Sequence, residues 1–439
     1  MLGALHEPVN PDVTEIANRL AALTQRSMAA ASRIQARNMA QASGSEYQLM
    51  DAATLTRAYT NVWMRALTRP HELLSIQLKA TTSLAQIWQS AFLPQESNVS
   101  DRRFRDESWS NDPLSRHYRD AFLAFEVAME DLIDTLADED GRDDLRVKFY
   151  TRQAISALSP ANYLATNAAA RSKFLETGGE SVLDGIDNLL SDLERGDGRL
   201  DIATNDPEAF EVGVDLATTE GEVIFQNELM QLIQYHPRTE TQHAVPMLFV
   251  PAWINKYYIM DMRPENSLIR YALDQGHSVF VISWANPEKA HADLDFTDYM
   301  KLGPLTALDV IRDITGEKKT NVLGFCIGGI LVTAMLGYLA ATGQDRINSA
   351  TTLATMVDFE NVGEIGVFID DDRLEMLRSH MEEKGYLEAY HLQDMFSMLR
   401  ENDLIWSFFE ANYLRGNKPR PFDLLFWNAD ATRLPKAML

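Results

Sequence analysis

The chain has 439 residues, of which 46% are apolar and 24% are charged, with a formal net charge of −24. This length is enough for two or three domains with a sizeable core, and the acidic balance argues against a nucleic-acid partner because phosphate binding needs a basic surface. Cys326 is the only cysteine, which excludes an internal disulfide framework and fits a reducing compartment. The first residues lack a basic segment followed by an apolar stretch, so we expect no secretory signal and a cytoplasmic protein.

The N-terminal part of the chain is predicted to be helical. Apolar residues recur at helical spacing in segments that begin near Asp12, run from Asp51 to a break at Pro70, and cover residues 73–92 and 118–136. The methionines and aromatic residues of these helices are expected in the core. The charged run 137–144 has no metal-ligand spacing and is expected to be a solvated loop. We assign residues 1–205 to a helical N-terminal domain.

The pattern changes near residue 210 to short apolar strands separated by helical stretches, which is typical of βαβ units. The predicted strands cover residues 212–216, 222–226, 247–250, 278–283, 321–325 and 350–356. Gly, Asp and Asn cluster over 196–206, which indicates a domain boundary. Helical spacing returns over 374–409.

Residues 322–341 contain no charged side chain, and a run of this length could be a membrane span. A buried strand followed by a buried helix has the same hydropathy. Because the run contains glycines around Cys326, we interpret it as strand and helix, and we expect no membrane span.

Cys326 lies at the centre of GFCIGG, residues 324–329, between a β-branched run and an apolar helix. This layout is typical of a nucleophile elbow, a sharp strand-to-helix turn that exposes the nucleophile at the top of an α/β-hydrolase sheet and needs flanking glycines for room. A thiolate attacks thioesters and leaves readily, so cysteine in place of serine favours acyl transfer over ester hydrolysis. The alternative is a small buried cysteine at the end of a strand.

Several further strings resemble the polyhydroxyalkanoate synthase family, whose members polymerise (R)-3-hydroxyacyl-CoA into storage polyester. They are DRRF at 101–104, YTRQ at 150–153, LSPAN at 158–162, TEG at 219–221, INKYYIMD at 254–261, SWANP at 283–287 and FDLLFWN at 422–428. The long helical N-terminal region resembles the single-subunit synthases. The strings at 101–104 and 150–162 are expected to pack and cap helices.

The resemblance implies that Cys326 holds the growing chain as a thioester. Elbow geometry implies that the amide of Ile327 is one oxyanion donor. The second donor is expected in the loop after strand 247–250, around Trp253 and Ile254, although the family usually has a smaller residue at the first of these positions. Residues 255–258 are read equally as a structural helix-entry loop or as substrate contacts.

The family's catalytic aspartate and histidine are expected beyond Leu439, so we assign neither within this chain and expect it not to polymerise at a normal rate. His380 and His391 are the only histidines after the cysteine and are expected to be exposed cap residues. Asp358 is expected to be a turn or cap residue.

The sequence therefore predicts an α/β-hydrolase core at 206–439 with a helical cap over about 360–439, preceded by the helical domain and truncated at its C-terminal end. The expected function is polymerisation of (R)-3-hydroxyacyl-CoA, with 3-hydroxybutyryl-CoA as donor, by a homodimer at cytoplasmic polyester granules. No metal or cofactor is implied, because the CoA thioester is the substrate. Two alternatives remain: a thiol-dependent hydrolase acting as a thioesterase, and a non-catalytic form that binds granules.

Overall fold

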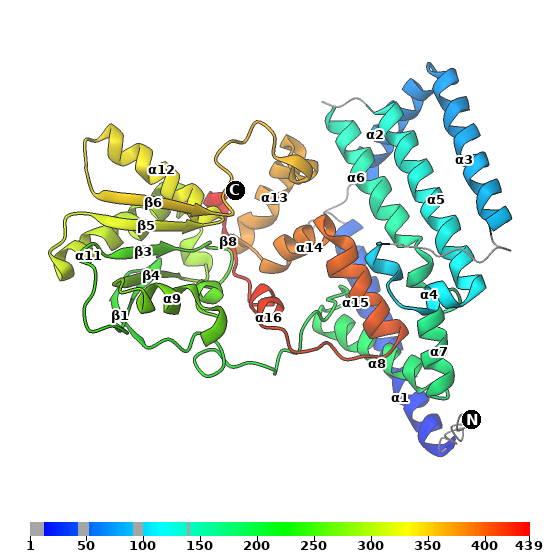
Figure 1. The fold of residues 1–439 in the computed structure, drawn as a ribbon, viewed down its shortest axis with the longest axis horizontal. Coiled ribbons are helices and arrows are strands. Elements are labelled where there is room, and N and C mark those ends of the chain that lie inside the picture. Colours follow the sequence, from blue (N-terminus) through cyan, green and yellow to red (C-terminus); the bar gives the residue numbers. More distant parts are fainter. Residues whose placement is uncertain (1–12, 43–51, 91–99, 138–140) are drawn as a thin grey trace. The chain divides into compact units, whose positions relative to one another are not determined.

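The computed structural model describes residues 13–42, 52–90, 100–137 and 141–439 (Figure 1). The chain forms two compact units. Of the described residues, the helical unit contains those within Met1–Thr204, Gly363–Asp370 and Met395–Pro419, and the sheet unit contains those within Asn205–Val362, Asp371–Asp394 and Arg420–Leu439. Residues 360–439, which we expected to form one cap, are thus divided between the two.

Amphipathic helices build the N-terminal part of the helical unit. They are α1 (Val13–Ala42), α2 (Ala52–Ala66), α3 (Pro70–Ser90), α4 (Ser108–Asn111), α5 (Pro113–Leu136), α6 (Arg142–Ala157), α7 (Ala168–Glu176) and α8 (Glu180–Arg195). Pro70 begins α3, because proline is tolerated at the first helical position. Residues 138–140 of the predicted charged loop lie outside the described residues, and Arg142, Asp143 and Asp144 form the first turn of α6, where we had predicted loop.

The strings at 101–104 and 150–162 pack and cap helices, as predicted. The carboxylate of Asp101 accepts a hydrogen bond from the backbone N–H of Arg103 at 2.9 Å, and the Arg103 guanidinium also contacts Glu126. Phe104 is buried. The side-chain amide of Asn162 donates to the carbonyl of Ser156 at 2.8 Å.

The sheet unit contains one mixed sheet. Its strands are β1 (Gly221–Gln226), β2 (Met230–Tyr235), β3 (Met247–Val250), β4 (Val279–Trp284), β5 (Thr320–Phe325) and β6 (Ile347–Leu353), in the order β1-β2-β4-β3-β5-β6. The pairs β1/β2 and β2/β4 are antiparallel, and the remaining pairs are parallel. This mixed sheet with its helices confirms the predicted α/β class.

One predicted strand is absent, one observed strand was not predicted, and one lies at a displaced position. Residues 212–216 form a tight turn whose ends, Val212 and Leu216, make only an isolated bridge. Strand β2 was not predicted. Strand β6 lies at 347–353 where we predicted 350–356, and it is exposed along most of its length.

Helices cover both faces of the sheet, and the central strands β3 and β4 are apolar at every position except Ser283. Along β4, Phe280 and Ile282 pack in one cluster with residues of α11 (Thr306–Thr315) and α12 (Ile327–Ala341). The alternating residues Val279 and Val281 pack in a second cluster with α9 (Leu268–Asp274). Side chains alternate between the faces of a strand, so burial on both faces gives a continuous apolar run.

The later residues of the chain are mostly helical, as predicted, with an interruption. Helix α13 (Asp371–Lys384) is followed by the two-residue strand β7 (Tyr386–Leu387), then by α14 (Ala389–Leu399), three short helical segments within Asn402–Leu414, and α16 (Asp423–Ala429). Strand β7 pairs with β8 (Leu434–Pro435). Across the described parts of the chain, none of the helices combines the length and apolar character that a membrane crossing requires.

Candidate active site

Cys326 connects β5 to α12 in a strained backbone conformation, with φ 54° and ψ −126°. A residue other than glycine held there stores free energy of about 1–3 kcal/mol, and such strain concentrates at functional sites. Two backbone hydrogen bonds fix the turn: the Cys326 N–H donates to the Leu353 carbonyl of β6, and the Gly329 N–H donates to the Cys326 carbonyl, both at 2.9 Å. The predicted strand-turn-helix context of the elbow is therefore present.

Glycines are required where α12 approaches the strands. A Cβ atom on Gly324 would lie 2.5 Å from the Cα of Gly329, and one on Gly328 would lie 2.2 Å from the carbonyl oxygen of Val250. Both distances are shorter than real Cβ contacts. The first turn of α12 thus packs directly on the end of β3 and on the loop that follows it.

The Cys326 side chain is half-buried, as expected of a nucleophile and unlike a sealed core cysteine. Within the described residues, its sulfur makes no hydrogen bond. Ile327 is the first residue of α12, so its N–H belongs to the turn whose donors have no partner inside a helix.

The loop after β3 is fixed by hydrogen bonds from the C-terminal segment to its backbone carbonyls. Thr432 bonds to the carbonyl oxygens of both Trp253 and Ile254. The Trp253 side chain is buried, with its ring 5.4 Å from that of Tyr299 and 6.3 Å from that of Trp284. This indole therefore packs in the core of the sheet unit.

Tyr258, which we read equally as structural or as a substrate contact, is structural. Its ring is 2% exposed, and its hydroxyl donates to the carboxylate of Asp430 at 2.9 Å. Burial, followed by the charge of Asp430, raises the pKa of the Tyr258 phenol above its ordinary value, so the phenol keeps its proton.

The two downstream histidines differ from the prediction. His391 is buried, with its ring 4.1 Å from Tyr390 and 5.3 Å from His380, and His380 is half-buried. The prediction of exposure was wrong because α14 packs this side chain against rings of its own helix and of α13. Asp358 is exposed and accepts a hydrogen bond from the Glu360 N–H at 3.0 Å, which confirms it as a turn residue.

Sequence reasoning missed two threonines of the site. Thr355 lies just after β6, and its hydroxyl is 3.3 Å from the Cys326 carbonyl and 3.1 Å from the Leu353 carbonyl. Thr432 is far away in sequence. Neither belongs to a motif, so only the folded structure identifies them.

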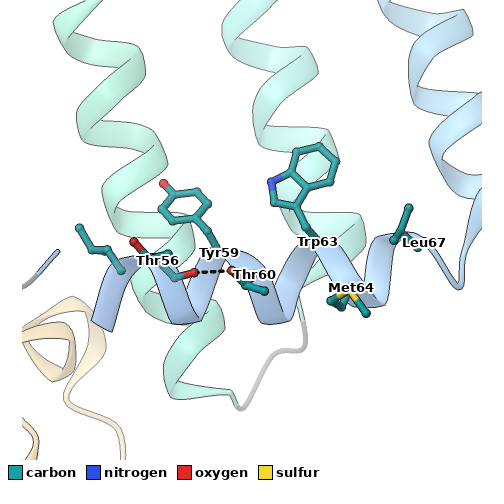
Figure 2. A pocket seen from close by; sticks show the side chains of 7 residues that line it. Thr56, Tyr59, Thr60, Trp63, Met64 and Leu67 are labelled. Carbon is teal, nitrogen blue, oxygen red and sulfur yellow. Dashed lines mark hydrogen bonds between the residues drawn. The ribbon is translucent and has the colours of Figure 1, made fainter. Parts of the chain in front are cut away.

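The helical unit carries an apolar groove of about 610 Å³ along α2 (Figure 2). Its lining residues are Leu55, Thr56, Tyr59, Thr60, Trp63, Met64 and Leu67. Trp63 is 50%, Met64 61% and Leu67 70% exposed, so the prediction of core packing is wrong for this stretch. The groove offers apolar and hydroxyl groups, which suit binding better than acyl-transfer chemistry.

Comparison with known proteins gives two family matches. Residues 100–272 match the family described as the N-terminus of poly-beta-hydroxybutyrate polymerase (PhaC), and residues 245–439 match the alpha/beta hydrolase fold. The second match covers the elbow and agrees with the sheet topology.

Named relatives cover most of the chain. It is 43% identical to poly(3-hydroxyalkanoate) polymerase of Methylorubrum extorquens over 87% of this chain and 65% of that protein. Identity to the polymerase subunit PhaC is 42% for Rhizobium meliloti (78% of this chain, 56% of that protein) and 41% for Cupriavidus necator (83% and 63%). The chain thus spans 56–65% of the length of these relatives.

Proposed function

Because this chain belongs to the poly(3-hydroxyalkanoate) polymerase family, we propose that it carries the family's acyl-transfer chemistry on Cys326. The observation that supports this most strongly is the strained elbow, which places a thiol at the N-terminal end of α12. A thiol with only a packing role has no need of that strain.

In the proposed reaction, the Cys326 thiolate attacks the carbonyl carbon of an (R)-3-hydroxyacyl-CoA. The carbon–sulfur bond to CoA breaks, CoA leaves as a thiolate that takes up a proton, and the acyl group stays on the enzyme as a thioester. The hydroxyl of a second hydroxyacyl group then attacks the carbonyl carbon of this thioester and loses its proton to a base. The bond between that carbon and the Cys326 sulfur breaks, Cys326 is released as a thiolate, and the ester bond of the polymer is formed.

The negative charge of each tetrahedral intermediate is proposed to be stabilised by the N–H of Ile327 and by an N–H of the loop around Trp253 and Ile254. Backbone donors of this kind are worth about a hundredfold to a thousandfold in rate. Support comes from the packing of Gly328 on Val250 and Pro251, which brings the first turn of α12 against the start of that loop.

We assign the base to none of the described histidines. His391 is buried beside Tyr390, and Cys326 has no hydrogen-bonded ionisable partner among the described residues. We therefore expect these 439 residues to acylate slowly and once, with no cofactor or metal. A chain that turns over repeatedly would contradict this.

Incubation with 3-hydroxybutyryl-CoA tests the proposal. Intact-protein mass spectrometry should show one acyl group on the chain, digestion should place it on Cys326, and Cys326→Ala should show none. Continuing release of CoA with free hydroxy acid, and neither adduct nor polymer, would instead establish the thioesterase alternative. Absence of any adduct would refute the proposed acyl transfer.

The apolar groove on α2 supports binding to the surface of a polyester granule in the cytoplasm. We further propose that the chain acts as a homodimer, whose mass can be measured by light scattering. Trp63→Ser and Leu67→Ser should weaken sedimentation with poly(3-hydroxybutyrate) particles, since both side chains are exposed. Tyr271→Ser, which removes an equally exposed aromatic residue from α9 of the sheet unit, is the control. Equal sedimentation of all variants would remove the groove from the proposal.

A further inference from the structure

We infer that Thr432 is a positioning residue that orients the oxyanion donor of the loop after β3. This inference rests on the proposed acyl transfer at Cys326 and adds a residue that the chemistry itself does not identify. It starts from a buried threonine, 1% exposed, that bonds to two consecutive peptide groups.

The two contacts use different atoms of the same residue. The Thr432 hydroxyl donates to the carbonyl of Trp253 at 2.6 Å, and the Thr432 backbone N–H donates to the carbonyl of Ile254 at 2.9 Å. Both peptide groups are therefore held from one side by the C-terminal segment.

Because of peptide geometry, these hydrogen bonds also fix the direction of an N–H group on the opposite side of the loop. A trans peptide group is planar, so its C=O and its N–H point in opposite directions. A hydrogen bond to the Trp253 carbonyl thus fixes the direction of the Ile254 N–H, which points away from Thr432. Among the described residues this N–H donates no hydrogen bond, which leaves it available for an oxyanion.

The start of the loop is held beside the nucleophile helix. Val250 pairs with Gly324 in the parallel β3/β5 register, so both strands end at the same edge of the sheet. A Cβ atom on Gly328 would lie 2.6 Å from the Pro251 carbonyl oxygen. The loop therefore begins against the first turn of α12 and is held further along by Thr432.

Contacts on both sides keep Thr432 in place. Before it, Asp430 accepts from the Tyr258 hydroxyl, and the Trp427 indole N–H donates to the Lys256 carbonyl at 2.7 Å. After it, the Arg433 backbone N–H donates to the side chain of Asn286 at 3.0 Å. The threonine is thus part of a rigid clamp, which is what the orientation of a donor requires.

Two reactions of Cys326 separate this role from a merely structural one. Acylation by 3-hydroxybutyryl-CoA passes through an oxyanion, whereas alkylation by iodoacetamide displaces iodide at a saturated carbon and forms none. Both can be measured on the full chain by mass spectrometry, and the single cysteine makes the alkylation specific. Thr432→Val keeps the shape of the side chain and removes the hydroxyl. Thr432→Ser keeps the hydroxyl.

Thr432→Val should slow acylation by about 10- to 100-fold, because a donor moved out of position loses most of its effect. Its alkylation rate should stay within about twofold of the unchanged chain, since the elbow is untouched. Thr432→Ser should restore acylation. Tyr258→Phe releases Asp430 without altering Thr432. It should slow acylation by a smaller factor and leave alkylation unchanged, and it provides a second variant in case Thr432→Val does not fold.

Equal acylation by the unchanged chain and by both hydroxyl-lacking variants, Thr432→Val and Tyr258→Phe, would overturn this inference and leave acyl transfer at Cys326 standing. A parallel loss of acylation and alkylation would show a structural role and would also overturn it. Absence of acylation in the unchanged chain would instead overturn the proposed function, and this inference with it.

Discussion

Gly328 offers a sharp test of the packing that forms the elbow. The change Gly328→Ala adds a Cβ atom 2.2 Å from the carbonyl oxygen of Val250 and 2.6 Å from that of Pro251. Both neighbours are backbone atoms of a buried strand end, so they cannot move aside as a flexible side chain would. The first turn of α12 must then shift away from β3 by about 1 Å.

The cost follows from the geometry. Overpacking of this kind destabilises by about 1–3 kcal/mol. Gly337, in the same helix, has nothing within 4 Å of its added Cβ, so Gly337→Ala should gain the helix propensity of alanine, about 1 kcal/mol. The two variants make the same chemical change in one helix and should differ by about 2–4 kcal/mol.

Urea denaturation followed by tryptophan fluorescence measures this difference. Gly328→Ala should unfold at lower urea than the unchanged chain, and Gly337→Ala at higher urea. Acylation of Cys326 should fall by about a hundredfold in the first variant only, because a displacement of about 1 Å at a reacting group has that effect. A Gly328→Ala protein as stable as Gly337→Ala would refute the close approach of α12 to β3.

Three further changes test other parts of the molecule. Cys326→Ala should abolish acylation while circular dichroism stays unchanged, and any residual adduct would place the acyl group elsewhere. Leu331→Ala, at a fully buried position of α12, should cost about 2–5 kcal/mol in urea denaturation, and a cost under about 1 kcal/mol would contradict its place in the core. Asp101→Asn keeps the cap and removes the charge beside Arg103. Burial alone would raise the pKa of Asp101, but its hydrogen bonds to Arg103 lower it below the ordinary 3.8, so its contribution is present above that pH and lost below it. The variant should be about 1 kcal/mol less stable at pH 7, with the difference shrinking as the pH falls below 3.8, and a pH-independent difference would contradict the ion pair.

The parts of the fold that were predicted correctly have local signals. Strand β3 is a continuous apolar run, β4 and β5 are mostly apolar, and the elbow is contained in residues 324–329. Strand β2 lacks such a signal. Gln231 and Gln234 fall on opposite faces of it, and its apolar residues Leu232 and Ile233 pack in different clusters, so neither alternation nor a continuous run is visible.

The parts that were missed depend on distant contacts. Thr432 meets Trp253 across 179 residues of sequence, and no residue spacing reports such a pair. His391 occupies a helical position that predicts exposure, yet neighbouring rings cover it. The prediction for Trp63 was wrong in the opposite direction, since this residue was expected in the core and is exposed. Helical periodicity identifies an apolar face without showing what covers it.

The division of the chain between its units has a practical consequence. The helical unit also includes Gly363–Asp370 and Met395–Pro419, so the polypeptide passes from one unit to the other at five places. Phe368 packs its ring 5.4 Å from that of Phe149, and the Tyr413 hydroxyl donates to Asp192. A polypeptide that begins at residue 206 would therefore contain Gly363–Asp370 and Met395–Pro419 without the N-terminal helices against which they pack. Each unit depends on residues encoded inside the other, and a cut at a single linker cannot release either one intact.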